Sequence, residues 1–176
     1  MVSGAPTGST FQWDFDGDGV AELTTNAPRA ACTVYAGYRE TVVTVVHGGR
    51  VVASAQAAVV ADDKLGAVRT TSDLGNGAFE VTITLVAKVP LTAPGLVERV
   101  PADWALEMLD SGGAQWKVGE ALEAVWPLKT AAGDELSLRF RLYAPPGAAV
   151  RLSGQASGYG PQGRVEVPVA GVITLP

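Results

Sequence analysis

Residues 11–19 read Phe-Gln-Trp-Asp-Phe-Asp-Gly-Asp-Gly, and this stretch decides how the N-terminal part of the chain folds. Its aromatic residues alternate with polar ones, a period of two that is typical of a β-strand with one buried face. The alternation puts Phe11, Trp13 and Phe15 on the buried face and Gln12 and Asp14 on the other. The Asp and Gly residues that follow predict a tight turn, because glycine readily adopts the positive φ angles that such turns need.

The residues after this turn extend the pattern. It consists of Trp13-Asp14-Phe15-Asp16-Gly17-Asp18-Gly19, Pro28, Tyr35-Ala36-Gly37-Tyr38 and Thr41-Val42-Val43-Thr44-Val45. This pattern resembles the PKD (polycystic kidney disease) domain, which implies an immunoglobulin-like β-sandwich from a secreted or cell-surface protein. Thr33 and Val34 stand where a His often precedes the family's Tyr, and only twelve residues precede Trp13. Those residues leave room for one short strand where the family usually has two. Either the chain begins within a domain or another segment fills the gap.

Composition independently favours an all-β fold of two immunoglobulin-like β-sandwich domains in tandem. The 176 residues include 21 Gly and 11 Pro, 47% are apolar, and Val, Thr and Ala recur in short runs broken by turn residues. A chain of this length can bury two small cores. We expect a PKD-like domain at residues 1–63 that is short of N-terminal strands, a polar linker at 64–77, and a second sandwich at 78–176.

Charge and hydropathy argue against two classes of partner. The formal net charge is −5 and the 13 Lys and Arg residues are not clustered, so we expect no nucleic-acid partner. No apolar run reaches the roughly 20 residues of a membrane helix, so we expect no membrane insertion in this segment. Residues 1–6 show no secretion signal, so the signal of a secreted protein would precede residue 1.

The second domain is predicted to begin with residues 79–86, where Phe79, Val81, Ile83 and Leu85 alternate with polar residues and face a core. Further features are Val100-Pro101-Ala102-Asp103-Trp104, Trp126-Pro127-Leu128, Ala132-Gly133-Asp134-Glu135, residues 136–142 and Ser153-Gly154. Together they resemble the tandem β-sandwich repeats of bacterial envelope and S-layer-associated proteins. That resemblance implies a spacer or an adhesive module.

The acidic turn is the one candidate for metal chemistry. Asp14, Asp16 and Asp18 at a spacing of two, with Glu22 four residues on, resemble the front half of a calcium loop, but Thr25 stands where such a loop has its bidentate Glu. The alternative is that these carboxylates accept hydrogen bonds from backbone amides and simply hold the turn. A structural calcium ion would be the only cofactor, and both interpretations stay open.

No enzyme signature is present, because the chain has neither a Gly-x-Ser-x-Gly elbow, nor a phosphate loop, nor His-Glu-x-x-His. We therefore expect a non-catalytic structural or adhesive module of a secreted or cell-surface bacterial protein. The alternative is an accessory carbohydrate-binding module that stacks exposed aromatic side chains on sugar rings. Its candidate ligand-binding residues are Trp104, Trp116 and Tyr159, the last within residues 157–163, which are expected to form a flexible loop.

The expected partners are other surface proteins or glycans. A sandwich that lacks strands exposes unpaired edges, and an added strand can complete it. That strand could be residues 163–167 or 169–175 of this chain, or it could come from a neighbouring domain or chain.

Overall fold

The computed structural model describes residues 4–34 and 37–175, and it is built from β-strands. No helix occurs in these described residues, so none is long and apolar enough to span a membrane. The all-β fold with a β-sandwich, expected from the sequence, is confirmed. The expected division into two sandwich domains in tandem is not confirmed, because the strands of both parts share one sheet. Of the residues that carry the PKD resemblance, Tyr35 and Ala36 lie outside the described residues.

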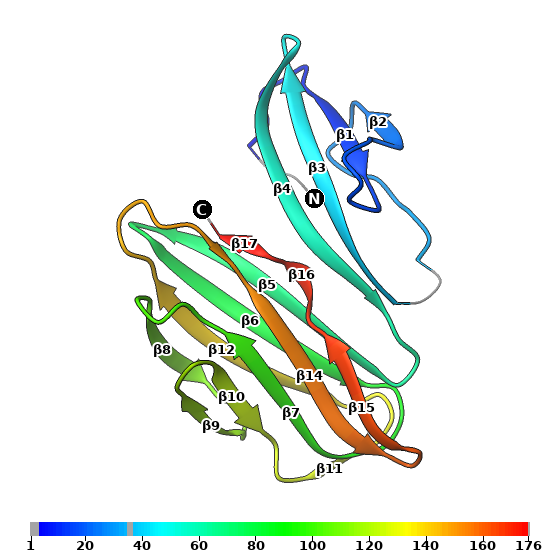
Figure 1. The fold of residues 1–176 in the computed structure, drawn as a ribbon, viewed down its shortest axis with the longest axis vertical. Coiled ribbons are helices and arrows are strands. Elements are labelled where there is room, and N and C mark those ends of the chain that lie inside the picture. Colours follow the sequence, from blue (N-terminus) through cyan, green and yellow to red (C-terminus); the bar gives the residue numbers. More distant parts are fainter. Residues whose placement is uncertain (1–3, 35–36, 176) are drawn as a thin grey trace.

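The N-terminal strands form one antiparallel section of sheet, which we call the N-terminal sheet. Its members are β1 (Thr10–Asp14), β2 (Leu23–Thr25), β3 (Gly37–His47) and β4 (Arg50–Ala61). Its strand order is β2-β1-β3-β4, and β3 and β4 form a long hairpin (Figure 1). One face buries Phe11 and Trp13 of β1 against Val43 and Val45 of β3, as the alternation of residues 11–15 predicts.

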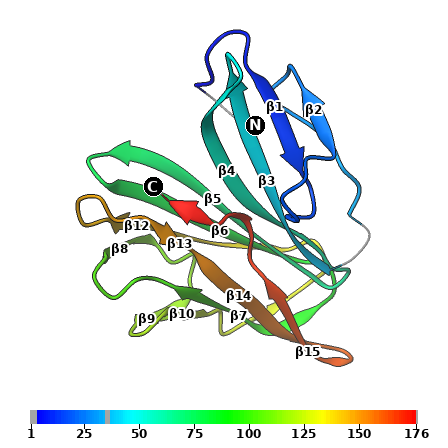
Figure 2. The same ribbon diagram turned by 45° about the horizontal axis from the view of Figure 1, so that its top comes forward.

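The rest of the chain forms a sandwich of two sheets. The first sheet contains β5 (Leu65–Gly75), β6 (Ala78–Ala87), β12 (Glu135–Tyr143) and β8 (Ala105–Asp110), in that order. The second, called the small sheet below, has the order β15-β14-β7-β10-β9, with β11 paired to β7. Its bounds are β7 (Leu91–Arg99), β9 (Gln115–Val118), β10 (Leu122–Val125), β11 (Lys129–Thr130), β14 (Ser153–Gly160) and β15 (Gly163–Pro168). Figure 2 shows the two layers, which enclose one core of Leu, Ile, Val, Phe and Trp side chains.

A short strand joins the two parts of the molecule. β16 (Ala170–Val172) pairs antiparallel with β4 on one side and parallel with β5 on the other. The N-terminal sheet and the first sheet of the sandwich thereby become one nine-stranded sheet (Figure 1). Immediately after β16, β17 (Thr174–Leu175) pairs with β13 (Val150–Arg151). The segment 169–175, one of those expected to add to the N-terminal strands, thus supplies the strand beside β4.

Two expectations about the middle of the chain are wrong. Residues 64–77 contain all of β5 and its turn into β6, instead of a linker, and Leu65 and Ala67 lie in the sandwich core. Residues 79–86 accordingly belong to the second strand of the sandwich rather than its first. The polar character of 70–77 misled the prediction because this half of β5 is largely exposed.

Candidate functional site

The acidic turn between β1 and β2 is held by its own carboxylates. Asp14, which is buried, accepts hydrogen bonds from the amides of Gly17 at 2.5 Å and Gly19 at 2.9 Å. Asp18 accepts one from the Val20 amide at 2.7 Å, and the Asp16 carboxylate one from the Asp18 amide at 3.3 Å. In addition, Glu22 accepts the Phe15 amide at 2.6 Å. In this turn the carboxylates therefore accept hydrogen bonds from backbone amides, as one of the two interpretations of the sequence expects.

The same turn has the donor set of a hard cation. One carboxylate oxygen from each of Asp14, Asp16, Asp18 and Glu22 lies within 4.8 Å of the others, and all but Asp14 are exposed. Oxygen ligands of this kind suit calcium, and each carboxylate oxygen can accept more than one partner. These four residues would hold the ion, which would neutralise their mutual repulsion and stiffen the turn.

Trp104 cannot take part in glycan binding, contrary to its place among the candidate residues. Its side chain is only 6% exposed and stacks on Phe79 with ring centroids 6.1 Å apart. The backbone turns at this point, where the Trp104 amide bonds to the Pro101 carbonyl at 3.1 Å. The turn directs the indole inward, and Trp104 stands outside any alternating run from which its burial could be predicted.

The structure does not bring Trp116 and Tyr159 together. Trp116 lies opposite Ala124, whose side chain is in the core, so it belongs to the core-facing side of the small sheet. Tyr159 is 57% exposed and lies on the outer side, because its neighbour Gly158 faces the core. It stands on β14 rather than in the flexible loop expected at 157–163. Trp104, Trp116 and Tyr159 therefore form no common aromatic platform.

A shallow groove runs over the outer side of the small sheet. Its volume is about 360 Å³, and it crosses β9, β10, β7 and β14. Gly95 lies at its floor, where a side chain would press on the Ala124 carbonyl and Val125. Val97 and Val125 supply exposed apolar surface, while Gln115, Lys117, Glu123 and Ser157 supply polar groups. Groups of this kind can contact one sugar ring or one short peptide segment.

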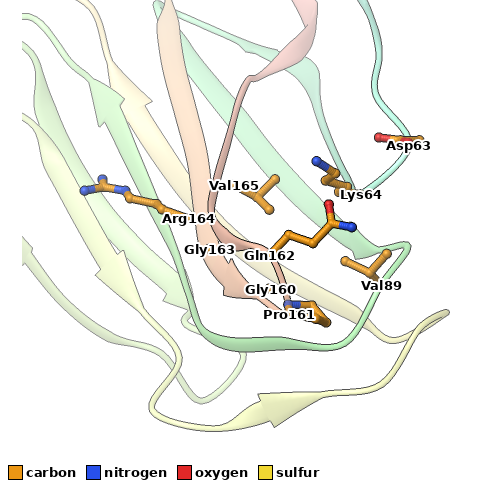
Figure 3. A pocket seen from close by; sticks show the side chains of 9 residues that line it. All are labelled: Asp63, Lys64, Val89, Gly160, Pro161, Gln162, Gly163, Arg164 and Val165. Carbon is orange, nitrogen blue, oxygen red and sulfur yellow. The ribbon is translucent and has the colours of Figure 1, made fainter.

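A smaller hollow of about 240 Å³ lies beside the tip of the β14–β15 hairpin (Figure 3). Lys64, Gln162 and two valines, Val89 and Val165, surround it, whereas the Arg164 side chain extends away. Its polar lining includes the Lys64 ammonium, the Gln162 amide and the Asp63 carboxylate, which can make polar contacts with a small ligand.

A buried ion pair inside the sandwich escaped the sequence analysis. Arg69 of β5 and Glu98 of β7 are each 1% exposed, and Arg69 Nη2 donates to both carboxylate oxygens at 2.6 and 2.7 Å. Arg69 Nη1 also donates to the Val172 carbonyl of β16 at 2.7 Å. Burial raises the pKa of Glu98, and the Arg69 guanidinium opposes that rise. The pair therefore links both sheets of the sandwich to β16. The signal in the sequence is the inward position of Arg69, which follows Leu65 by four residues and Ala67 by two.

A second ion pair spans the junction between the N-terminal sheet and the sandwich. Arg151 of β13 bonds to Glu40 of β3, and the Tyr38 hydroxyl donates to the same carboxylate at 2.8 Å. These bonds hold the pKa of Glu40 below its ordinary value, Arg151 being the larger cause. Burial and the neighbouring Glu40 raise the pKa of Tyr38. A cavity of about 190 Å³ lined by Tyr38, Arg151 and Ile173 lies beside this pair.

Comparison with solved structures returns partial likenesses to β-sandwich domains. The GAE domain of GGA2p from Saccharomyces cerevisiae is 13% identical at a TM-score of 0.47, over 67% of this chain and 95% of that one. The chitin-binding domain of Chi18aC from Streptomyces coelicolor is 15% identical at a TM-score of 0.39, over 52% of this chain and 91% of that one. The chain matches no model of a known protein family, and no curated protein matches it in sequence.

Proposed function

We propose that this chain is a non-catalytic structural or adhesive module of a secreted or cell-surface bacterial protein, with other surface proteins as its partners. The observation that carries the proposal is the insertion of β16 between β4 and β5, which makes one sheet of the N-terminal strands and the sandwich. A module that transmits load or presents a surface needs its parts in fixed orientation, whereas domains in tandem move relative to one another by default.

Two further features support this proposal. The Arg69–Glu98 pair and the Glu40–Arg151 pair both cross between parts of the fold that sequence separates widely. Two sequence resemblances also support it: the PKD-like pattern of residues 13–45 and the repeat-like pattern of the second part. Both resemblances imply an extracellular location, which we include in the proposal. A calcium ion in the acidic turn would serve the same end, since it would stiffen the turn.

A single-molecule stretching experiment tests the structural proposal. The chain is placed between folded marker domains and pulled from its ends. A unit joined through β16 unfolds in one event that releases the N-terminal strands and the sandwich together. Two separate events, with the N-terminal sheet opening first at low force, would contradict the proposal.

The second candidate is a carbohydrate-binding module, favoured by the groove on the outer side of the small sheet and by the exposed Tyr159 on that side. Affinity electrophoresis through soluble polysaccharides tests it. Retardation that is lost in Val125→Lys would establish glycan binding at this groove, and loss in Tyr159→Ala would show that the exposed tyrosine on the same side takes part. Unretarded migration across the panel would leave the structural module as the function.

A further inference from the structure

The sheet edges of this molecule differ in how well they are guarded against an added strand. Natural edges are guarded by bulges, prolines, charges or shortness. Among the described strands, β4 has a bulge beside Val51 and is partly covered by β16, and β2 has three residues. The β8 edge contains a register shift and ends at Asp110, and β15 carries Arg164, Glu166 and Pro168. β9 has neither a bulge nor a proline. Its guards are its length of four residues and one charge, Lys117, and that charge is paired with Glu123 of the neighbouring strand β10.

At the β9 edge, side chains on the core-facing side of the small sheet remain exposed to solvent. Trp116 and Val118 lie on the core-facing side, opposite Ala124 and Leu122 of β10. Those two partners are 5% and 0% exposed, yet Trp116 is 46% and Val118 48% exposed. Figures 1 and 2 both place β9 at the margin of the molecule. An additional strand along β9 would bury both side chains and pair the open backbone groups.

We propose that β9 pairs antiparallel with β9 of a second copy of this chain, across a two-fold axis at Trp116. Opposite residues of an antiparallel pair share a face, so the axis must pass through a residue. An axis at Lys117 would set two lysines against each other, and an axis at Gln115 would draw the Gly112–Gly113 turn into the strand. An axis at Trp116 avoids both problems. It pairs residues 114–118 of one copy with residues 118–114 of the other.

The contacts made by this register are complementary. Trp116 meets its symmetry mate on the core-facing side, which forms a cross-strand aromatic pair. On the outer side Gln115 lies opposite Lys117, so no like charges face each other. Within each copy Lys117 is already paired with Glu123 at 3.2 Å. A two-fold contact of this kind closes on itself and yields a dimer rather than a fibre.

Sedimentation velocity on the full chain tests the proposal, at concentrations up to about 1 mM because so small an interface belongs to the weak class. We expect a concentration-dependent dimer, and a blue shift of tryptophan emission as Trp116 leaves water. Gln115→Glu should tighten the dimer by about 2- to 30-fold, because each new charge pair with Lys117 forms twice. Gln115→Lys should weaken it similarly, and Trp116→Ala should leave a monomer.

The matched control is Tyr159→Ala, which removes an exposed aromatic from the outer side of the same sheet and should leave the dimer intact. Circular dichroism of each variant checks that the fold survives. A wild-type chain that stays monomeric throughout would overturn the proposal and leave the β9 edge to a strand of another protein. Dimerisation that is as strong in Gln115→Lys as in the wild type would also overturn the proposal. So would a Tyr159→Ala variant whose dimer is weakened as much as that of Trp116→Ala.

Discussion

Arg69 is the side chain on which three strands depend, because it bonds to Glu98 of β7 and to the Val172 carbonyl of β16 from its place on β5. Removing one partner of a buried ion pair leaves an uncompensated charge and costs about 3–5 kcal/mol. We expect that cost in the free energy of unfolding for Arg69→Met and for Glu98→Gln, measured by urea denaturation. The double variant Arg69→Met/Glu98→Leu should lose much less than the sum. Single variants that each cost under about 1 kcal/mol would show that the pair is unimportant.

Calcium binding at the acidic turn is a separate prediction about single residues. An incomplete extracellular site binds at about 10⁻⁴ to 10⁻³ M, so about 1 mM calcium should add roughly 0.4–1.4 kcal/mol. For a chain of this size that corresponds to a rise of about 1–5 °C in the melting midpoint. Asp16→Asn/Asp18→Asn keeps the oxygens that accept the backbone amides but removes two charges, so it should abolish the rise. Equal midpoints in calcium and in chelator for the wild type would exclude the site.

Single residues also show where sequence reasoning succeeds. The burial of Phe11 and Trp13 follows from strict alternation, and the core bears it out. Trp104 was assigned wrongly because a turn after Pro101, and not a periodic strand, sets its direction. Arg69 was passed over because a charged residue at an inward position looks like an interruption of the pattern, and only the fold supplies Glu98 as its partner.

Among the elements, β16 makes the strongest demand on a glycine. Gly171 has a φ of +93°, and a Cβ there would collide with the Arg69 carbonyl. We expect Gly171→Ala to displace β16 from between β4 and β5 and to lower the midpoint of urea unfolding. Gly163→Ala is the matched control, because Gly163 has a φ of +115° but open space around it. The control should show backbone strain alone, about 1–3 kcal/mol. If the two variants lost equal unfolding free energy, β16 would not contribute to the stability of the joined sheet.

The β3–β13 contact predicts a pH dependence. The folded-state pKa of Glu40 lies below its ordinary value of 4.5, because Arg151 and Tyr38 bond to the carboxylate. A lowered pKa stabilises the fold above the unfolded-state value, and this contribution is lost as pH falls through the folded-state value. The stability difference between the wild type and Glu40→Gln should therefore be full near pH 7 and disappear in acid. A difference that stays constant from pH 7 to about pH 2 would refute this role.

Strands whose side chains alternate regularly between buried and exposed could be predicted from the sequence. Strands that are only partly buried could not. The β3–β4 hairpin and β6 follow from their Val, Thr and Phe periodicity. The sequence of β5 resembles a linker because only its first residues face the core. Residues 157–160 of β14 resemble a loop because they are rich in glycine, whereas residues 161–162 do form a turn. The pairing of segment 169–175 with β4 could be anticipated only as one of several choices, since pairing across more than a hundred residues leaves no local signal.

The whole molecule behaves, on this account, as one unit in which the N-terminal sheet depends on the sandwich. The N-terminal core contains few buried residues, with Phe11, Trp13, Val43 and Val45 as its centre. So small a core gives little stability by itself. The N-terminal sheet therefore draws its stability from β16, from the Glu40–Arg151 pair and from Val60 of β4, which packs on the sandwich core.

Native-state hydrogen exchange, resolved by residue, tests this claim most directly, because it reports the opening free energy of each part separately. We expect the slowest amides of β3 and β4 to share the opening free energy of β6 and β12, which is the value for global unfolding. This expectation would be contradicted if every amide of β3 and β4 exchanged through a separate opening of much lower free energy while β6 and β12 stayed protected.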